Sequence, residues 1–170
     1  MRFAGLCAVF AVRDAIRPRA GILAETGMRE GSHVLDYGCG PGGYIVPLAR
    51  IVGAIGRIYA LDSNPLAVRR VRRLARRDGL ANVEALLSDT ATGLDSGSLD
   101  AVLLYDVFHL LADPEAVLGE LHRALKPEGL LSFSDHHMSE QRILDCVTRS
   151  GLFRCARKGR HTYTFTKAAP

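Results

Sequence analysis

Four glycines follow a short apolar run in the segment HVLDYGCGPGGY, which covers residues 33–44. The run is typical of a buried strand, and glycines directly after a strand allow a ligand to approach the backbone, because no Cβ stands in the way. A helix that begins there directs its unpaired N–H groups at the ligand. The spacing fits G-x-G-x-x-G, and Asp62 follows about 20 residues later. By itself, this pattern is typical of dinucleotide binding.

Three carboxylates change that interpretation. Asp36 precedes the glycines, and Asp62 and Asp89 stand at the ends of the next two apolar runs. A carboxylate beside the glycine loop repels a pyrophosphate, whereas it attracts an ammonium or sulfonium group. We therefore expect a cationic nucleoside ligand between the three carboxylates rather than a dinucleotide.

The elements that must position these residues alternate between strands and helices. Strands are predicted over residues 33–37, 57–62, 83–89, 99–108 and 130–135, followed by a terminal hairpin of strands 152–158 and 162–167. Helices are predicted over 42–52 and 64–77, from 113 to the Lys-Pro-Glu-Gly segment at 126–129, and over 139–151. Runs such as AVLLY are apolar on successive residues, which indicates strands buried on both faces of a mostly parallel sheet. The fold class predicted is a doubly wound, Rossmann-like α/β fold with a C-terminal antiparallel strand and helices on both faces.

Five segments of the chain carry a resemblance to a known family. They are, in order, VLDYGCGPGGY, IYALDSNP, LLSDT, LDAVLLYDVFHLL and ALKPEGLLSFSD. Over about residues 31–134 they resemble the successive signature segments of class I S-adenosylmethionine-dependent methyltransferases. The resemblance implies that the cofactor is S-adenosylmethionine and that the reaction is an in-line methyl transfer. It places a methyltransferase core at residues 31–170, with an N-terminal helical extension or lid at residues 1–30.

The resemblance also implies a role for each carboxylate. Asp36, through a water molecule, and the backbone of residues 38–40 would hold the methionine part of the cofactor. Asp62 would accept hydrogen bonds from both ribose hydroxyls, while Ser88 and Asp89 would bind the adenine edge. In a purely structural alternative, Asp62 and Asp89 cap loops. The cofactor-binding residues predicted are Asp36, Tyr37, Gly38, Cys39, Gly40, Asp62, Ser63, Ser88, Asp89, Thr90 and Tyr105.

Methyl transfer needs a general base only if the nucleophile carries a proton that must leave. The candidates are His109, Tyr105 and Asp106 at the end of the fourth strand, with Asp135, His136 and His137 at the end of the fifth. His109 is favoured, because the family places acceptor-contacting residues after the fourth strand, although a capping or packing histidine is the alternative. Tyr105 would face the methionine amino group and the transferred methyl group. No metal site is predicted.

Three local features complete the prediction. Pro47 falls inside the helix after the glycine loop, where it should bend that helix. The Gly/Ser/Asp-containing segment after the third strand is expected to be a loose connection. In the N-terminal extension, Phe3, Leu6 and Phe10 could form the apolar face of a lid over a small or apolar acceptor.

A small-molecule acceptor is the favoured interpretation, and three alternatives remain. An RNA methyltransferase would use the basic face of helix 64–77, which holds Arg69, Arg70, Arg72, Arg73, Arg76 and Arg77. A non-catalytic subunit that binds the cofactor beside a catalytic partner and an NAD-dependent oxidoreductase are the others. The net charge of +4 permits nucleic acid without requiring it. The four scattered cysteines and the lack of a membrane-length apolar segment predict a cytoplasmic protein with reduced thiols. No residue indicates the oligomeric state.

Overall fold

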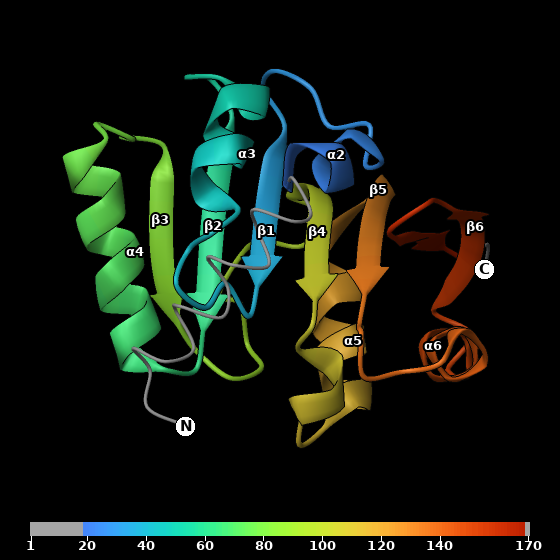
Figure 1. Cartoon of the computed structure of the whole chain (residues 1–170). Helices are drawn as coiled ribbons and strands as arrows, with labels where there is room; N and C mark the ends of the chain where they lie inside the picture. Colours follow the sequence, from blue (N-terminus) through green and yellow to red (C-terminus); the bar gives the residue numbers. More distant parts are fainter. Residues whose placement is uncertain (1–18, 169–170) are drawn as a thin grey trace.

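The computed structural model describes residues 19–168 of the chain. It contains a seven-stranded sheet in the order β3-β2-β1-β4-β5-β7-β6 (Figure 1). The strands are β1 (His33–Tyr37), β2 (Arg57–Asp62), β3 (Val83–Leu87), β4 (Leu99–Tyr105), β5 (Leu125–Ser134), β6 (Phe153–Lys158) and β7 (Tyr163–Lys167). The helices are α2 (Arg19–Ala24), α3 (Ile45–Val52), α4 (Pro65–Arg77), α5 (Pro114–Ala124) and α6 (Glu140–Thr148), with the 3-10 turn η1 (Phe108–Leu110).

The five strands β1 to β5 all run parallel. The strand order reverses between β1 and β4. β7 is antiparallel to both β5 and β6, so the C-terminal hairpin completes one end of the sheet. This arrangement confirms the predicted doubly wound fold. Because β1, β2 and β4 all end at the same edge, the residues that follow them meet at the reversal point, where open α/β sheets bind ligands.

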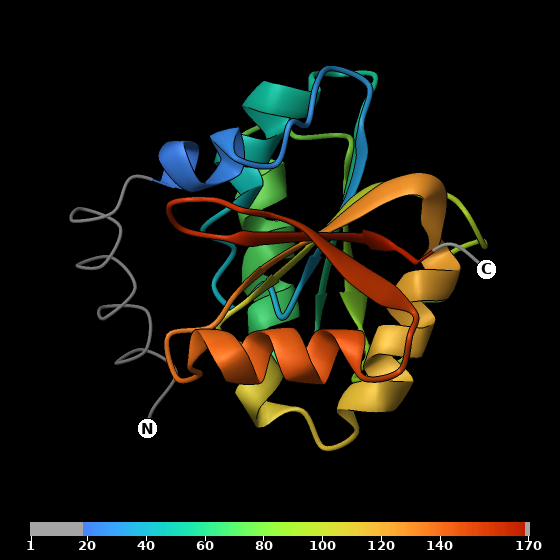
Figure 2. The same cartoon turned by 90° about the vertical axis from the view of Figure 1, so that its right-hand side faces the viewer.

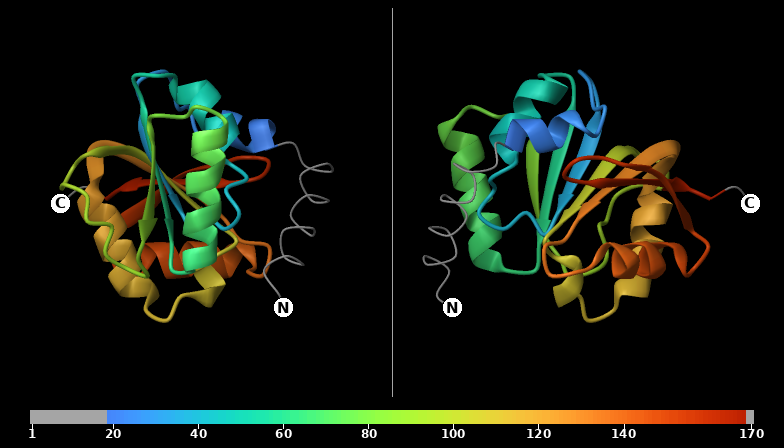
Figure 3. Two further views of the ribbon diagram at one scale, coloured as in Figure 1. Left: turned by 90° about the vertical axis from the view of Figure 1, so that its left-hand side faces the viewer. Right: turned by 45° about the vertical axis from the view of Figure 1, so that its right-hand side comes forward.

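Two hydrophobic layers cover the sheet, one on each face. The helices α2, α3 and α4 lie on one face, and α5 and α6 lie on the other (Figures 2 and 3). Within β1 the side chains alternate between the layers: Val34 packs with Leu48 and Val71, while Leu35 belongs to the layer of Leu121. Burial on both faces explains the near-continuous apolar strands of the sequence.

The helix after the glycine loop begins later than predicted. It starts at Ile45 instead of residue 42, because Gly42 adopts φ +82° and belongs to a turn in which Ile45 donates to the Gly42 carbonyl oxygen. Pro47 is therefore the third residue of α3, where a backbone N–H has no partner within the helix. Pro47 therefore removes no hydrogen bond from α3, and the reason for the expected bend does not apply.

Two strand boundaries also differ from the prediction. β4 ends at Tyr105 rather than at residue 108, because Asp106 takes the left-handed value φ +54°, rare for a residue with a Cβ. β5 begins at Leu125, directly after α5, so Lys126-Pro-Glu-Gly lies in the strand instead of only ending the helix. The pairing of β5 with β4 accommodates this segment by a register shift between Leu99 and Ala101.

Of the predicted N-terminal extension, the structure describes α2 and the turn that leads to β1. Phe3, Leu6 and Phe10 lie outside the described residues. Within residues 19–168, no helix is long and apolar enough to span a bilayer.

Candidate cofactor site

The glycine loop between β1 and α3 is shaped by close contacts. Gly38 has φ +74°, and its N–H donates to the Leu61 carbonyl oxygen at 2.8 Å. A Cβ at Gly38 would lie 2.7 Å from Cγ2 of Val107, in the loop after β4. The loop therefore folds tightly between the ends of β2 and β4, and only glycine fits at this position.

Asp36, the last residue but one of β1, carries a buried carboxylate, and one oxygen of this carboxylate has no hydrogen-bond partner within residues 19–168. It pairs with Ala60 and Leu103 in the sheet, its residue surface is 2% exposed, and Oδ2 has no hydrogen-bond partner among the described residues. Burial raises the pKa of Asp36 to about 7, against the lowering effect of Arg19, and the charge of Asp62 raises it further. A buried oxygen without a donor lowers the stability of the folded protein, so its position indicates a ligand that donates a hydrogen bond.

Asp62, at the end of β2, connects two loops. Its Oδ2 accepts from the Gly40 N–H at 2.8 Å, and its Oδ1 accepts from the Asn64 N–H at 2.8 Å. Asn64 in turn caps α4 through the Leu66 N–H. The structural alternative, loop capping, is thus realised at Asp62. Each carboxylate oxygen keeps a further lone pair that can accept a ligand hydroxyl.

Tyr37 supports the loop after β3. Its hydroxyl donates to the backbone carbonyl oxygen of Asp89, and burial together with the nearby Asp89 carboxylate raises the pKa of Tyr37 to about 12. Ser88 and Asp89 follow the last residue of β3, Leu87, and so belong to the loop rather than to the predicted strand. The tyrosine holds this loop beside the glycine loop.

Tyr105 closes the site from the end of β4. Its hydroxyl lies 2.7 Å from Oγ of Ser132, and its ring meets Tyr44 edge-on with a centroid distance of 5.2 Å. Burial raises the pKa of the Tyr105 hydroxyl. At neutral pH Tyr105 is therefore a neutral wall of the site.

These residues enclose a cavity of about 270 Å³ at the carboxyl ends of β1, β2 and β4. Every predicted cofactor-binding residue lines it except Thr90, and so do two of the predicted catalytic residues, Tyr105 and Asp106. The prediction missed other lining residues: Arg19, Pro41, Gly43, Tyr44, Leu61, Asn64, Ala67, Val107, Leu110 and Leu111.

Arg19 is the missed residue with the clearest chemistry. It is 9% exposed, and its guanidinium carbon lies 4.6 Å above the centre of the Tyr44 ring. A Cβ at Gly43 would lie 1.1 Å from Nη1 of Arg19, so the glycine makes room for this side chain. The second glycine of Gly42-Gly43 was the only sequence signal of a close neighbour. It did not indicate which residue that neighbour is.

His109 lies apart from this cavity. Its Nδ1 is 2.9 Å from Oδ2 of Asp135, its backbone N–H donates to the same oxygen, and its ring lies 4.2 Å from that of His137. It lines a second cavity, of about 340 Å³, between η1 and α6. Asp106 accepts instead from the backbone N–H of His136 and contacts its Nδ1. In the part of the chain that the structure describes, no three potential metal ligands form a cluster.

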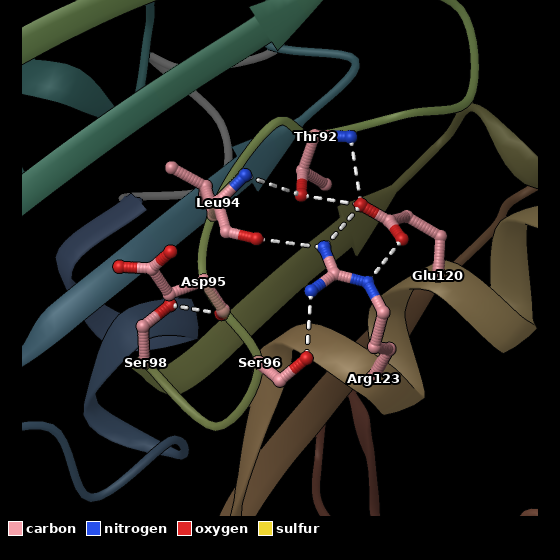
Figure 4. Close-up of polar contacts among 7 residues, drawn as sticks. All are labelled: Thr92, Leu94, Asp95, Ser96, Ser98, Glu120 and Arg123. Atoms are coloured by element: carbon pink, nitrogen blue, oxygen red, sulfur yellow. Dashed lines mark hydrogen bonds and ion pairs between the residues drawn. The ribbon is translucent and has the colours of Figure 1, made fainter.

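The segment after β3 is anchored, contrary to the expected loose connection. Glu120 of α5 accepts from the N–H and the hydroxyl of Thr92, and Arg123 binds Glu120, the Leu94 carbonyl oxygen and the Ser96 hydroxyl (Figure 4). Hydrogen bonds from Arg123 lower the pKa of Glu120 to about 2, and those from Thr92 add to the effect. The loop that carries Asp89 is therefore fixed to α5 at its far end.

Comparison with known proteins connects this site to a family. The family profile described as "Methyltransferase domain" matches residues 28–163, which include every strand except part of β7. The chain belongs to this family.

Single relatives agree with this assignment. The methyltransferase domain is 36% identical over 131 residues to the arsenite methyltransferase of Aquipseudomonas alcaligenes, covering 72% of this chain and 38% of that protein. It is 37% identical over 123 residues to an uncharacterised 37.1 kDa protein in transposon TN4556 of Streptomyces fradiae, covering 71% and 35%. A SAM-dependent methyltransferase from Aquifex aeolicus has the same fold, with a TM-score of 0.77, 27% identity and coverage of 86% and 88%. The chain spans well under half the length of the two sequence relatives.

Family membership confirms the resemblance found in the sequence, and with it S-adenosylmethionine as the cofactor. The cavity fits this cofactor in one specific respect. S-adenosylmethionine carries an ammonium and a carboxylate group on its methionine part, and the cavity presents the unsatisfied Asp36 carboxylate together with the Arg19 guanidinium. A pyrophosphate would offer no donor to Asp36.

Proposed function

We propose that this domain transfers a methyl group from S-adenosylmethionine to a small molecule, with the cofactor bound in the cavity of about 270 Å³. The observation that carries the proposal is Asp36, whose buried Oδ2 lacks a partner while its pKa is raised to about 7. A protein tolerates such a group when a ligand satisfies it. An ammonium group beside Asp36 both donates the missing hydrogen bond and favours the ionised carboxylate.

Each end of the cofactor has a complementary partner in this assignment. Asp36 binds the methionine ammonium, and Arg19 binds the methionine carboxylate. Asp62 accepts from the ribose hydroxyls with the lone pairs that its loop contacts leave over, and Asp89 accepts from the adenine amine with Ser88 beside it. This assignment keeps the roles inferred from the sequence for Asp62, Ser88 and Asp89. It replaces the water-mediated contact of Asp36 by a direct one and adds Arg19.

The cofactor supplies a methyl group on a positively charged sulfur, which a nucleophile can attack directly. The chain contributes position and exclusion of water. Tyr105 and Tyr44 wall one side of the cavity with their rings, and Leu110 and Leu111 contribute apolar surface beside them. A dry, fixed environment favours a displacement in which charge disappears.

We assign proton acceptance, where the acceptor requires it, to Asp106. Of the three predicted catalytic residues, His109 lies outside the lining of the cavity and the Tyr105 hydroxyl is buried against Ser132. Asp106 lines the cavity, and its left-handed backbone conformation holds the carboxylate next to His136. Strained residues of this kind gather at functional sites. His136 can take the proton onward.

The structure favours a small acceptor over RNA. All six arginines of α4 are exposed, and Arg72 also donates to the Ala85 carbonyl oxygen of β3. Because α4 begins beside the cavity and returns along β3 (Figure 1), Arg76 and Arg77 belong to the last turn, at the helix end farther from the cavity. RNA bound to this face would need a long path to reach the methyl group.

Calorimetry with S-adenosylhomocysteine and with NAD tests the proposal. We expect the wild-type domain and Glu128→Gln, which alters an exposed carboxylate of β5, to bind only the former. Asp36→Asn should weaken that binding by about 10- to 100-fold, the value of a charge-assisted hydrogen bond. Binding of NAD instead, or an unchanged affinity in Asp36→Asn, would overturn the assignment. A single-stranded RNA that binds with a steep salt dependence would favour the RNA alternative.

A further inference from the structure

The helix α2 connects the cofactor cavity to the C-terminal hairpin. Its first residue, Arg19, lines the cavity, and Glu25 follows its last residue. The described part of α2 is held to the rest of the domain by tertiary contacts, with Leu23 buried against the sheet and Glu25 bound to the hairpin. Figures 2 and 3 show the tip of the β6–β7 hairpin directly beside it.

Glu25 makes an unusually complete set of contacts with that tip. Its carboxylate accepts from the His161 N–H at 3.0 Å, from the Thr162 N–H at 3.0 Å and from the Thr162 hydroxyl at 2.8 Å. Its own carbonyl oxygen accepts from the Arg157 guanidinium. Partial burial raises the pKa of Glu25, but the hydrogen bonds from Thr162 and His161 outweigh it and leave the pKa below its ordinary value. The carboxylate is therefore ionised at neutral pH.

The hairpin tip is built to receive this carboxylate. Gly159 donates its N–H to the Thr162 carbonyl oxygen at 2.7 Å, which closes the turn, and a Cβ at Gly159 would lie 2.2 Å from Oε2 of Glu25. Behind the tip, β7 is paired with both β5 and β6, and Phe165 is fully buried. The hairpin is thus a rigid support for Glu25.

On its other side, α2 packs against the sheet mainly through apolar contact, beside the contact of Arg19 with the Tyr44 ring. Leu23 is buried in the layer of Ile45 and Leu48, and the Thr26 hydroxyl donates to the Leu23 carbonyl oxygen at 2.7 Å. Such packing holds the helix against the sheet, whereas it allows rotation or sliding by small amounts. The hydrogen bonds of Glu25 are directional, so they can fix the orientation of α2 on the sheet.

We propose that Glu25 is a positioning residue: by binding the turn of residues 159–162, it fixes α2 so that the Arg19 guanidinium binds the carboxylate of the methionine part of the cofactor. This inference rests on the proposed function. The C-terminal hairpin then contributes to cofactor selectivity, because it fixes the position of Arg19. Arg19 in turn distinguishes the whole cofactor from a nucleoside that lacks the amino-acid part. 5′-Methylthioadenosine, which lacks the amino-acid part, has nothing for Arg19 to bind.

The test is calorimetric titration with S-adenosylhomocysteine and with 5′-methylthioadenosine. Glu25→Gln should weaken S-adenosylhomocysteine binding about 10-fold and change 5′-methylthioadenosine binding less than about two-fold. In an Arg19→Gln background, which should show the same selective loss, Glu25→Gln should cause little further change. Glu140→Gln is the matched control, because it removes a carboxylate that binds Lys158 on the same hairpin but does not contact α2.

The outcomes separate this inference from the proposed function. Failure of the wild type to bind either ligand would contradict the proposed function itself. Wild-type binding of both ligands with equal losses in Glu25→Gln, or losses that add to those of Arg19→Gln, would overturn the positioning role. Should Glu25→Gln fold poorly, Thr162→Val removes a single donor to Glu25 and should show a smaller loss with the same ligand selectivity.

Discussion

Two carboxylates on opposite sides of the sheet, Asp36 and Glu120, show how differently this domain treats negative charge. Asp36 is buried, one of its oxygens has no partner among the described residues, and its pKa is raised to about 7. Both oxygens of Glu120 accept from Arg123, one of them also accepts from Thr92, and its pKa is lowered to about 2 (Figure 4). The surroundings of Asp36 disfavour the ionised carboxylate, whereas those of Glu120 stabilise it.

Under the proposed function, the difference is that between a ligand site and a structural one. The contacts of Glu120 are complete within the chain, so its charge stabilises the fold and fixes the loop after β3. Asp36 is incomplete without a partner from outside, which makes the ligand-free domain less stable than it could be. Natural proteins accept such local instability where function needs it.

The largest expected effect concerns the stability of the ligand-free domain with Asp36→Asn. The pKa of Asp36 is about 7 in the folded domain, against an ordinary value of 3.8 that applies in the unfolded chain. Below about pH 4 the residue is protonated in both states, and between about pH 4 and 7 the unfolded state loses its proton first. The free energy of unfolding of the wild type should therefore fall over this range relative to Asp36→Asn, by on the order of 4 kcal/mol. Urea unfolding at several pH values measures this, and parallel pH profiles would contradict it.

A second contrast sets Gly38, in the cofactor loop, against Gly93, in the segment that Glu120 anchors. Both have positive φ, +74° and +69°. A Cβ at Gly38 would clash with Val107, whereas a Cβ at Gly93 would have no atom within 4 Å. Gly38→Ala should lower the free energy of unfolding by about 3 kcal/mol, from strain and overpacking together. Gly93→Ala should lower it by about 1 kcal/mol, from backbone strain alone. Equal losses in thermal or urea unfolding would show that the close contact with Val107 is not the reason for a glycine at position 38.

The smallest expected effect is that of Glu120→Gln. The side chain is partly exposed to solvent, so we expect a loss of only about 1 kcal/mol in the free energy of unfolding at neutral pH. Because the folded pKa is depressed to about 2, this stabilisation is present above the unfolded pKa and disappears as the pH falls through about 2. S-adenosylhomocysteine affinity should stay within about two-fold of the wild type. A large loss of affinity would show that the anchored loop controls the adenine side of the cavity.

Much of the site was predictable from the sequence because its residues are coupled to local patterns. Each of the first three predicted strands ends near a carboxylate, and glycines follow the first of them. Apolar periodicity predicts the secondary structure of these segments. Their convergence then follows from the parallel order of the strands. For this reason Asp36, Asp62 and Asp89 were all placed at one cavity.

The residues that the sequence did not reveal depend on tertiary contacts. Arg19 reaches the cavity from α2, which precedes the sheet, and no spacing connects it to the glycine loop. His109 follows β4 as expected, but the left-handed turn at Asp106 redirects the chain, and His109 contacts Asp135 outside the cavity lining. The anchoring of the loop after β3 by Arg123 likewise depends on how α5 packs, which composition does not specify.

The most direct test of the account is the pH dependence of S-adenosylhomocysteine affinity, measured by calorimetry for the wild type and for Asp36→Asn. If Asp36 binds the ammonium group, the wild-type affinity should rise as the pH increases through about 7 and then level off, because only the ionised carboxylate pairs with the ligand. Asp36→Asn should bind more weakly and show no such rise. A wild-type affinity that is independent of pH, or the same pH dependence in both proteins, would contradict the central role of Asp36.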